Sequence, residues 1–507
     1  MPGLTAGLNI GLSGLTAAQN SLDVIGHNIA NVNTPGYSRQ IAQLATAGSS
    51  SFGGLVYGTG VNLQAIQGIR DQLLNLQITV STAQQSGAQA RYQGLQTISS
   101  IFTDDGTSGI SSQLNAFFTS LQKVSAQPED ASLRTNLVGT AQNLISTLQT
   151  KYQSLRDAQS SADQQVATLV PTVNTLTAQI AALNKKLAGE VNPDQDNTAI
   201  DQRQDLANQL AKIVGVQTYI DSKGQMNINL DGGVAPLVIG GTAYTMTSIQ
   251  NNTPPATAPF YNAVEVSLGG AGPFTDVTAS ITNGEMGAQL DLRDNLIAGY
   301  EKKLDELAAG IAYNMNVLQS GGYSLDGVQH NLDFFQNAGG NTNHLPSAIQ
   351  VPPDVGAQVP ANDYKGMVLA LSVNAAIVAN PSLFAASSTG AVGDNQNVQA
   401  MVALQTSAST VDSTGVGPAG AATGPFSTFI TGLVTKVGTD ASQWKITSTN
   451  VENITTALTK QRDSVSAVDL DTEAANLITY QRGYQASARF VSVISQLTDQ
   501  LINNLGV

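Results

Sequence analysis

Both ends of the chain carry regularly spaced apolar residues that predict long amphipathic helices. Near the amino terminus these positions recur at steps of three and four, which places them on one face of a helix. They are Leu4, Leu8, Leu12, Leu15, Ala18, Leu22, Ile25 and Ile29. The row near the carboxy terminus comprises Leu470, Ala474, Leu477, Tyr480, Tyr484, Ala488, Val491, Ile494, Leu497, Leu501 and Leu505. The spacing of this second row is that of a coiled coil.

Helical periodicity also dominates the interior of the chain. The longest pattern runs from Ala131 to Leu187, and a kink is expected at Pro171 because proline removes a helical hydrogen bond. Asp469, Asp471 and Glu473 stand where the carboxy-terminal helix should begin, so their charges oppose the positive end of its dipole. Further helices are expected at residues 70–102, 285–319, 395–407 and 445–463.

Two interior regions break the helical pattern. Between residues 214 and 281, short runs such as Met226 to Leu230 alternate by twos and are separated by Gly-rich turns, which predicts a small β domain. Residues 320–393 are rich in Gly, Asn and Pro and predict a second, irregular insertion, with a strand at residues 367–373.

The predicted fold is mainly α with inserted β structure. We expect an elongated helical bundle built from both chain ends, with terminal coiled-coil helices, one small inserted β domain and a second irregular insertion. The expected domains are terminal axial helices at 1–65 and 465–507, a helical core at 66–213, 285–319 and 394–464, a β domain at 214–284 and the second insertion at 320–393.

Composition and charge exclude several functional classes. Charged residues make up only 11% of the chain and the net charge is −14, which repels nucleic acids and anionic membrane surfaces. Cysteine is absent, so disulfides, thiolate metal sites and thiol nucleophiles are excluded. No tract approaches the roughly 18 uninterrupted apolar residues of a membrane span, and the first basic residue is Arg39. We therefore expect neither membrane insertion nor a cleaved signal peptide.

Candidate catalytic and ligand-binding patterns are weak. His27, His330 and His344 lack a second ligand at the spacing of a zinc motif. The glycines of Gly415 to Gly420 match a dinucleotide-binding pattern, but Pro418 and the missing strand favour a flexible loop.

Three aspartates form the remaining candidate. Asp194, Asp196 and Asp201 could bind calcium, although the loop lacks the glycine and the terminal Glu of a calcium loop, which favours an exposed turn before a helix. We predict no catalytic residue, metal or cofactor, and no enzymatic activity.

One segment contains more Asn, Pro and Gly residues than a helix end requires. Asn28, Asn31 and Asn33 follow an apolar helix and run directly into Pro35 and Gly36, which predicts a helix end, a tight turn and a specialised packing role.

This segment carries a family resemblance. Leu12 to Gln19, followed by Asn28 to Gln40, is similar to the amino-terminal signature of bacterial flagellar rod, hook and hook-associated proteins. The sequence from Pro35 to Arg39, with Tyr37 inside it, resembles hook-associated members, and blocks at 201–210, 287–294, 393–395 and 471–481 are similar too. Ala467 departs from the usual Gly, and residues 320–393 match only in patches.

The resemblance implies a structural protein that joins hook to filament outside the cell. It implies export through the flagellar export apparatus, a cytoplasmic chaperone on the carboxy-terminal helix, and a ring of subunits that contacts the hook protein and hook-associated protein 3. The terminal helices would line the axial channel, with the insertions outside.

The apolar seams suggest a mechanism for such assembly. A seam that no partner covers should fray in the monomer and fold when neighbouring subunits supply the other face. Interfaces between different faces of successive subunits generate rings or helical arrays. We predict an assembly interface comprising Leu4, Leu8, Leu12, Leu15, Leu22, Ile25, Asn28, Ile29, Asn31, Asn33, Pro35, Gly36, Tyr37, Leu477, Tyr484, Val491, Ile494, Leu497, Leu501 and Leu505.

Two other classes stay open. A surface adhesin could use the β insertion at 214–281 as a binding module, which ligand affinity of that region alone would reveal. An enzyme could use the Asp-rich loops, which would require activity that is lost when a defined carboxylate is mutated.

Overall fold

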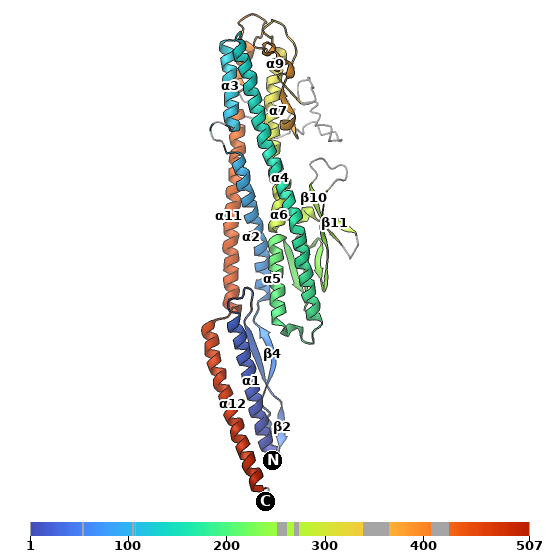
Figure 1. The fold of residues 1–507 in the computed structure, drawn as a ribbon, viewed down its shortest axis with the longest axis vertical. Coiled ribbons are helices and arrows are strands. Elements are labelled where there is room, and N and C mark those ends of the chain that lie inside the picture. The colour runs from blue at the N-terminus through green and yellow to red at the C-terminus, as the bar shows by residue number, and fades with distance from the viewer. Residues whose placement is uncertain are drawn as a thin grey trace.

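The computed structural model is a long rod of helices with a β domain on one side (Figure 1). Both chain ends lie at the same extremity of the rod. The fold class predicted from the sequence, mainly α with inserted β structure, is confirmed. The structure describes residues 2–52, 55–103, 106, 108–250, 261–267, 273–337, 365–406 and 425–505.

The end of the rod that holds both termini contains two helices and two strand pairs. Its elements are α1 (Pro2–Ala30), β1 (Gln40–Thr46), β2 (Ser49–Phe52), β3 (Leu55–Gly58), β4 (Val61–Gly68) and α12 (Leu470–Leu505). Strands β1 and β4 pair antiparallel, as do β2 and β3. The sequence analysis assigned this region to helices alone and missed all four strands.

The shaft of the rod is built on α2 (Gln72–Ile101) and α11 (Phe426–Ser466), which lie side by side (Figure 1). Polar contacts set their register: Ser81 and Thr455 share a hydrogen bond of 2.7 Å between hydroxyls, and the guanidinium of Arg91 lies 4.7 Å from the ring centre of Trp444. The predicted start of this second helix at residue 445 is wrong. The helix begins at Phe426, because its first turns also bury apolar side chains at helical spacing.

The far end of the rod has an aromatic core. Phe117 of α3 (Ile110–Ala126) contacts Phe118, Phe334 and Phe335, and the neighbouring ring centres lie 4.8 to 6.3 Å apart. The first half of α4 (Ala131–Ala188) and α7 (Ala298–Gly321) complete this core. The other elements at this end are β12 (Phe335–Asn337), α8 (Met367–Ala370), β13 (Leu371–Val373), α9 (Ala375–Ala379), the 3-10 helix Pro381–Leu383 and α10 (Gln396–Ala403). The strand predicted at 367–373 is therefore wrong in its first half, which is helical.

The β domain shares its core with the rod. Its elements are β5 (Val216–Ile220), β6 (Met226–Leu230), β7 (Pro236–Ile239), β8 (Thr242–Ala243), β9 (Met246–Gln250), β10 (Asn262–Ser267) and β11 (Phe274–Asp276). The sheet orders are β5-β6-β7-β8 and β11-β10-β9. Val166, Val173 and Ile180 of α4 are fully buried against strand residues such as Ile228 and Val264. The apolar stripe of α4 thus packs on β structure, and α5 (Asn197–Ile213) closes the same core.

Helix α4 has one stretch that is long and apolar enough to cross a membrane by length and composition alone. Its apolar side chains belong to the two cores described above, with Leu144 in the far core and Val170 beside the β domain. The helix continues through Pro171, so the predicted kink does not end it.

Two buried carboxyl groups lie one turn apart on α7. Glu301 and Asp305 are 7% and 1% exposed. Burial raises the pKa of Glu301 to about 7, against the lowering effect of Arg156 and Lys365. Burial also raises the pKa of Asp305 to about 7, although its carboxylate accepts hydrogen bonds from backbone N–H groups of the 366–368 segment at 2.9 Å.

These groups predict a pH-dependent stability. Because both folded-state pKa values are raised, the stabilisation is fully present below about pH 4 and is lost as pH rises toward 7. Deprotonation of Glu301 should account for a decrease in the free energy of unfolding on the order of 3 kcal/mol, and this decrease should be absent in Glu301→Gln. Urea unfolding of the parent and the variant at pH 5 and pH 8 measures it; equal pH dependence in the two proteins would contradict the assignment.

Candidate functional site

The terminal helices α1 and α12 pack antiparallel through a glycine-lined face of α1. A β carbon added to Gly11 would lie 2.7 Å from Cγ2 of Val491, and one added to Gly7 would lie 3.5 Å from Cδ1 of Ile494. Gly14 comes one turn later on the same face. At Gly11 a β carbon would force Val491 or Phe490 to move, whereas at Gly7 it would meet Ile494 at ordinary van der Waals distance. The sequence analysis missed the glycines, although their spacing of three and four was visible.

The predicted apolar interface residues divide into two faces of this pair. Those that are buried or half-buried are Leu4, Leu8, Leu15, Leu22, Ile25, Val491 and Ile494. Those that are exposed are Leu12, Ile29, Leu477, Tyr484, Leu497 and Leu501. The side chain of Leu505 lies outside the described residues. Further exposed apolar side chains that were not predicted are Ile10, Ile478, Phe490, Val493 and Ile502. The pair therefore has a covered inner face and an apolar outer face.

Asn28 is the centre of a hydrogen-bond network that fixes the end of α1. Its side-chain oxygen accepts from the Tyr37 hydroxyl and from the backbone N–H of Gln40, each at 2.9 Å. Its amide nitrogen donates to the Gln40 carbonyl at 2.8 Å and to Oε2 of Glu473 at 3.3 Å. Asn28 is 1% exposed, so the structure places it inside its own chain.

An ion pair extends the network to the first turn of α12. Nε of Arg39 lies 2.6 Å from Oε1 of Glu473, and the Glu473 side chain is 1% exposed. The Arg39 backbone N–H also donates to the Ser466 carbonyl at 2.8 Å, at the end of α11. A charge-assisted pair of this kind ties α1, β1, α11 and α12 together at one point. We refer to Asn28, Tyr37, Arg39 and Glu473 as the junction cluster.

A second set of contacts joins this region to the shaft. Asp201 of α5 accepts hydrogen bonds from Ser38 N and Oγ at 2.9 and 2.8 Å, and from Nε of Arg70 at 2.7 Å. Arg70 also donates to the side chain and the carbonyl of Asn197 at 2.9 Å. Burial and the nearby charges of Asp201 and Glu473 raise the pKa of Tyr37 to about 12, so its hydroxyl keeps its proton as a donor at neutral pH.

The remaining predicted residues build the turn between α1 and the cluster. Helix α1 ends at Ala30, as predicted, and the side-chain amide of Asn31 donates to the His27 carbonyl at 3.0 Å. Pro35 and Asn33 are exposed. Gly36 has φ +80°, a left-handed conformation in which a side chain is strained, so glycine is required in this turn.

The structure also shows the surroundings of the aspartates that were considered as calcium ligands. Asp196 accepts from the Ala199 backbone N–H at 3.1 Å and so caps α5, whereas Asp201 is buried within α5. The exposed turn predicted before this helix is present, since Asp194 is exposed and Asp196 is half-buried just ahead of α5. Among the described residues, no group of three or more His, Cys, Asp or Glu side chains could hold a metal. His344 and the 415–420 glycines lie outside the described residues.

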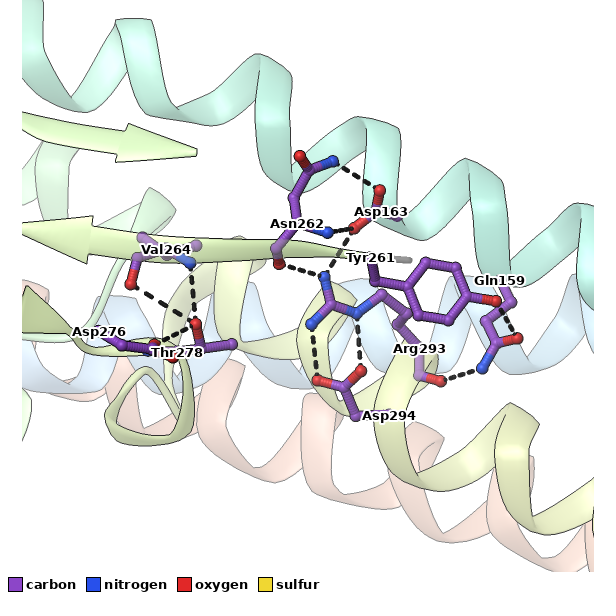
Figure 2. Close-up of polar contacts among 9 residues, drawn as sticks. All are labelled: Gln159, Asp163, Tyr261, Asn262, Val264, Asp276, Thr278, Arg293 and Asp294. Carbon is purple, nitrogen blue, oxygen red and sulfur yellow. Dashed lines mark hydrogen bonds and ion pairs between the residues drawn. The ribbon is translucent and has the colours of Figure 1, made fainter. Parts of the chain in front are cut away.

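Arg293 forms a further polar cluster, which holds the β domain against the rod (Figure 2). It lies in a π-helix, Leu292–Ile297, that separates α6 (Gly284–Asp291) from α7, where one continuous helix was predicted. Its Nη1 donates to Asp163 of α4 and to the Asn262 carbonyl of β10, both at 2.7 Å, and its other nitrogens bind Asp294. Gln159 donates to the Arg293 carbonyl at 2.6 Å. The sequence analysis quoted Arg293 within a family block without assigning it a role.

Replacement of Arg293 should cost the fold heavily. Arg293→Met leaves the carboxylate of Asp163, which is 8% exposed, without its cation. Breaking a buried pair from one side costs about 3–5 kcal/mol. Arg462→Met is the matched control, because Arg462 pairs with Asp463 at the surface and should cost under about 1 kcal/mol. Urea unfolding measures both variants, and equal losses would contradict this role of Arg293.

The architecture of the rod and its terminal helix pair indicates the class of protein. A rod that gathers both termini into one helix pair and exposes apolar side chains on that pair has the architecture expected of a subunit of a larger assembly. Comparisons with known proteins agree. Residues 8–37 match the family model "Flagella basal body rod protein", and residues 460–505 match "Flagellar basal body rod FlgEFG protein C-terminal". The class is that of the flagellar axial proteins.

Matches in the interior of the chain point to one kind of flagellar axial protein. Residues 95–335 match the family model "Flagellar hook-associated protein FlgK helical domain". Flagellar hook-associated protein 1 of Salmonella typhimurium is 28% identical over 98% of this chain and 99% of the relative, and that of Bacillus subtilis is 26% identical over 99% and 98%. The chain is similar to flagellar hook-associated protein 1 over almost its whole length, and it is a structural component of the flagellum.

A solved structure supports the fold independently. The flagellar hook junction protein FlgK from Burkholderia pseudomallei superposes with a TM-score of 0.62 at 18% identity, covering 77% of this chain and all of that one. The family is structural, and its members are components of the extracellular flagellum.

Proposed function

We propose that this protein joins the flagellar hook to the filament as a ring of identical subunits. The observation that carries the proposal is the terminal pair, which presents exposed apolar side chains on both helices, among them Leu12, Val493 and Leu497. Leu12 and Leu497 are 45 and 44% exposed, and apolar side chains exposed to this extent gain free energy when a neighbour covers them.

The proposed assembly mechanism is coupled ordering at the hook tip. The inner face of the pair is covered within one chain, so a single subunit buries one apolar face of each terminal helix and leaves the other face exposed. The free end of the pair, away from the junction cluster, has few buried side chains. The apolar residues of α1 and α12 that are buried are Ala17, Ala18, Val24 and Ile25, all in the half of α1 near the junction cluster. We therefore keep the prediction that the free ends fray until neighbours cover the outer face.

The proposal includes the partners of the ring and the arrangement of its subunits. Terminal pairs would form the inner wall of the ring, with hook protein below and hook-associated protein 3 above. Each predicted domain would have a separate role. Contacts between subunits would come from 1–65 and 465–507. The helical core would support the ring through 66–213, 285–319 and 394–464, and the two insertions, 214–284 and 320–393, would face outward. Heterologous contacts between different faces of successive subunits permit such an open array.

Electron microscopy of a deletion strain tests the function. Cells that lack the protein should build hooks without filaments and shed flagellin into the medium, and a plasmid copy should restore filaments. Filaments of normal length on the deletion strain would rule out the junction role.

Export should depend on α1. The proposal includes passage through the flagellar export apparatus without a cleaved signal, helped by a cytoplasmic chaperone that covers α12. Removal of residues 2–30 should keep the protein in the cytoplasm, while the cores formed around α4 still fold. Immunoblots of cell and medium fractions measure this, and normal secretion of the truncated chain would contradict it.

A further inference from the structure

We propose that a cleft between the shaft and the junction region binds an oxyanion at Arg203. The cleft has a volume of about 550 Å³ and lies between α5, the start of α2, the turn at residues 36–38 and the β5–β6 hairpin. Leu73, Tyr219 and Ile220 at its mouth are 66, 53 and 39% exposed. The inference does not rest on the junction role.

Arg203 is a buried cation that no carboxylate contacts among the described residues. It is 3% exposed and lines the cleft. Its Nη1 donates to the neutral oxygens of Asn184 and Gly224 at 2.9 and 2.8 Å, and its Nε has no hydrogen-bond partner in the described part of the chain. A buried guanidinium in this state gains most from a carboxylate or phosphate, which accepts two parallel N–H bonds and supplies the missing charge.

The other charged groups of the cleft do not fill this role. Asp201 is fully engaged by Ser38 and Arg70, and Arg462 is paired with Asp463. Asp194 and Asp205 also line the cleft, but neither is paired with Arg203. Burial and the nearby Arg70 charge lower the pKa of Arg203 to about 10, against the raising effect of Asp221, so Arg203 stays charged at pH 7. Asp221 makes no ion pair with Arg203 among the described residues, and its carboxylate accepts hydrogen bonds from the backbone N–H groups of Lys223 and Gln225.

The ligand chemistry is that of a single oxyanion group. It could come from free phosphate or from a carboxylate of a second copy of the chain. Gly36, Ser38 and Ser466 line the same cleft, so an oxyanion bound in it would stiffen the connection between the shaft and the terminal pair.

Thermal unfolding of the full chain, with inorganic phosphate against chloride at matched ionic strength, tests the proposal. Phosphate should raise the Tm of the parent by a few degrees and should leave that of Arg203→Gln unchanged. Arg462→Gln, a charge removed from the same cleft, should keep the phosphate effect. Arg203→Lys replaces the Gln variant if the latter does not fold, and its phosphate effect should be weakened because it lacks the two-pronged donor.

Nitrogen-15 spectra of the arginine Nε–H groups separate the two sources of the oxyanion. The Arg203 signal, assigned by its loss in Arg203→Lys, should move with added phosphate in dilute protein. If it moves with protein concentration but not with phosphate, the oxyanion is a carboxylate of a second copy. If it moves with neither, or if Arg203→Gln keeps the full Tm response to phosphate, the proposal is overturned.

Discussion

Glu473→Gln should release α12 from the rod and abolish filament growth. The carboxylate is buried, pairs with Arg39 and accepts from Asn28. Glutamine keeps one acceptor oxygen but removes the charge that pairs with Arg39, and it turns an NH2 group toward one of the two donors at the point where α1, α11 and α12 meet. We expect a cost of about 3–5 kcal/mol, the range for breaking a buried ion pair from one side. Because the two cores lie elsewhere, the loss should concentrate in the terminal pair.

Hydrogen exchange resolved along the chain measures this effect. Amides of α12 should exchange much faster in Glu473→Gln than in the parent, while those of α4 should not change. Asp471→Asn is the matched control, since Asp471 stands in the same first turn but is exposed. It removes only a dipole interaction of about 0.3–1 kcal/mol. Similar exchange rates in the two variants would show that the junction cluster does not hold α12.

Aspartate at two neighbouring positions of α12 should stop filament growth for different reasons. Ile494 is half-buried and faces Gly7 of α1, whereas Leu497 is 44% exposed on the outer face. In Ile494→Asp, an unpaired carboxylate would have to be desolvated inside the pair, at a cost of several kcal/mol. In Leu497→Asp the pair stays intact, and only the contact with a neighbouring subunit is lost.

Circular dichroism and motility separate the two variants. Helix content, which fraying of the free ends already lowers in the parent monomer, should fall further in Ile494→Asp and stay at the parental level in Leu497→Asp, and the cores should melt at the parental temperature in both. Neither variant should support filaments, and secretion must be measured alongside, because the chaperone is proposed to bind the same helix. If Leu497→Asp grows filaments as well as the parent, the outer face is not an interface; if the core of Ile494→Asp melts much earlier, α12 belongs to the stable core.

Strong periodicity made the long helices predictable, because apolar residues spaced like those of α4 lie on one face only if the segment is an α-helix. It did not reveal what covers the stripe. Val166 and Val173 pack on strands, and nothing local to a helix specifies that choice. The strands β1 and β4 were missed because Gln40 to Thr46 alternates weakly and its side chains are half-buried or exposed.

The junction cluster shows a different limit. The density of Asn residues from Asn28 onward marked the segment as special, but the partner Glu473 lies 445 residues away in sequence. Periodicity and turn chemistry are local signals and cannot pair such positions. The one available hint was an arginine just after the turn and a glutamate in the first turn of the last helix, in a chain with few charges.

The most direct test of the account is whether neighbouring subunits cover the outer face of the terminal pair in the flagellum. The chain has no cysteine, so a single introduced thiol reports on one position. Leu497→Cys should react quickly with a maleimide in the purified monomer and many times more slowly in assembled flagella. Thr242→Cys, at an exposed position of the β domain, should react equally in both states. If Leu497→Cys reacts as quickly in flagella as in the monomer, subunits do not assemble through this face.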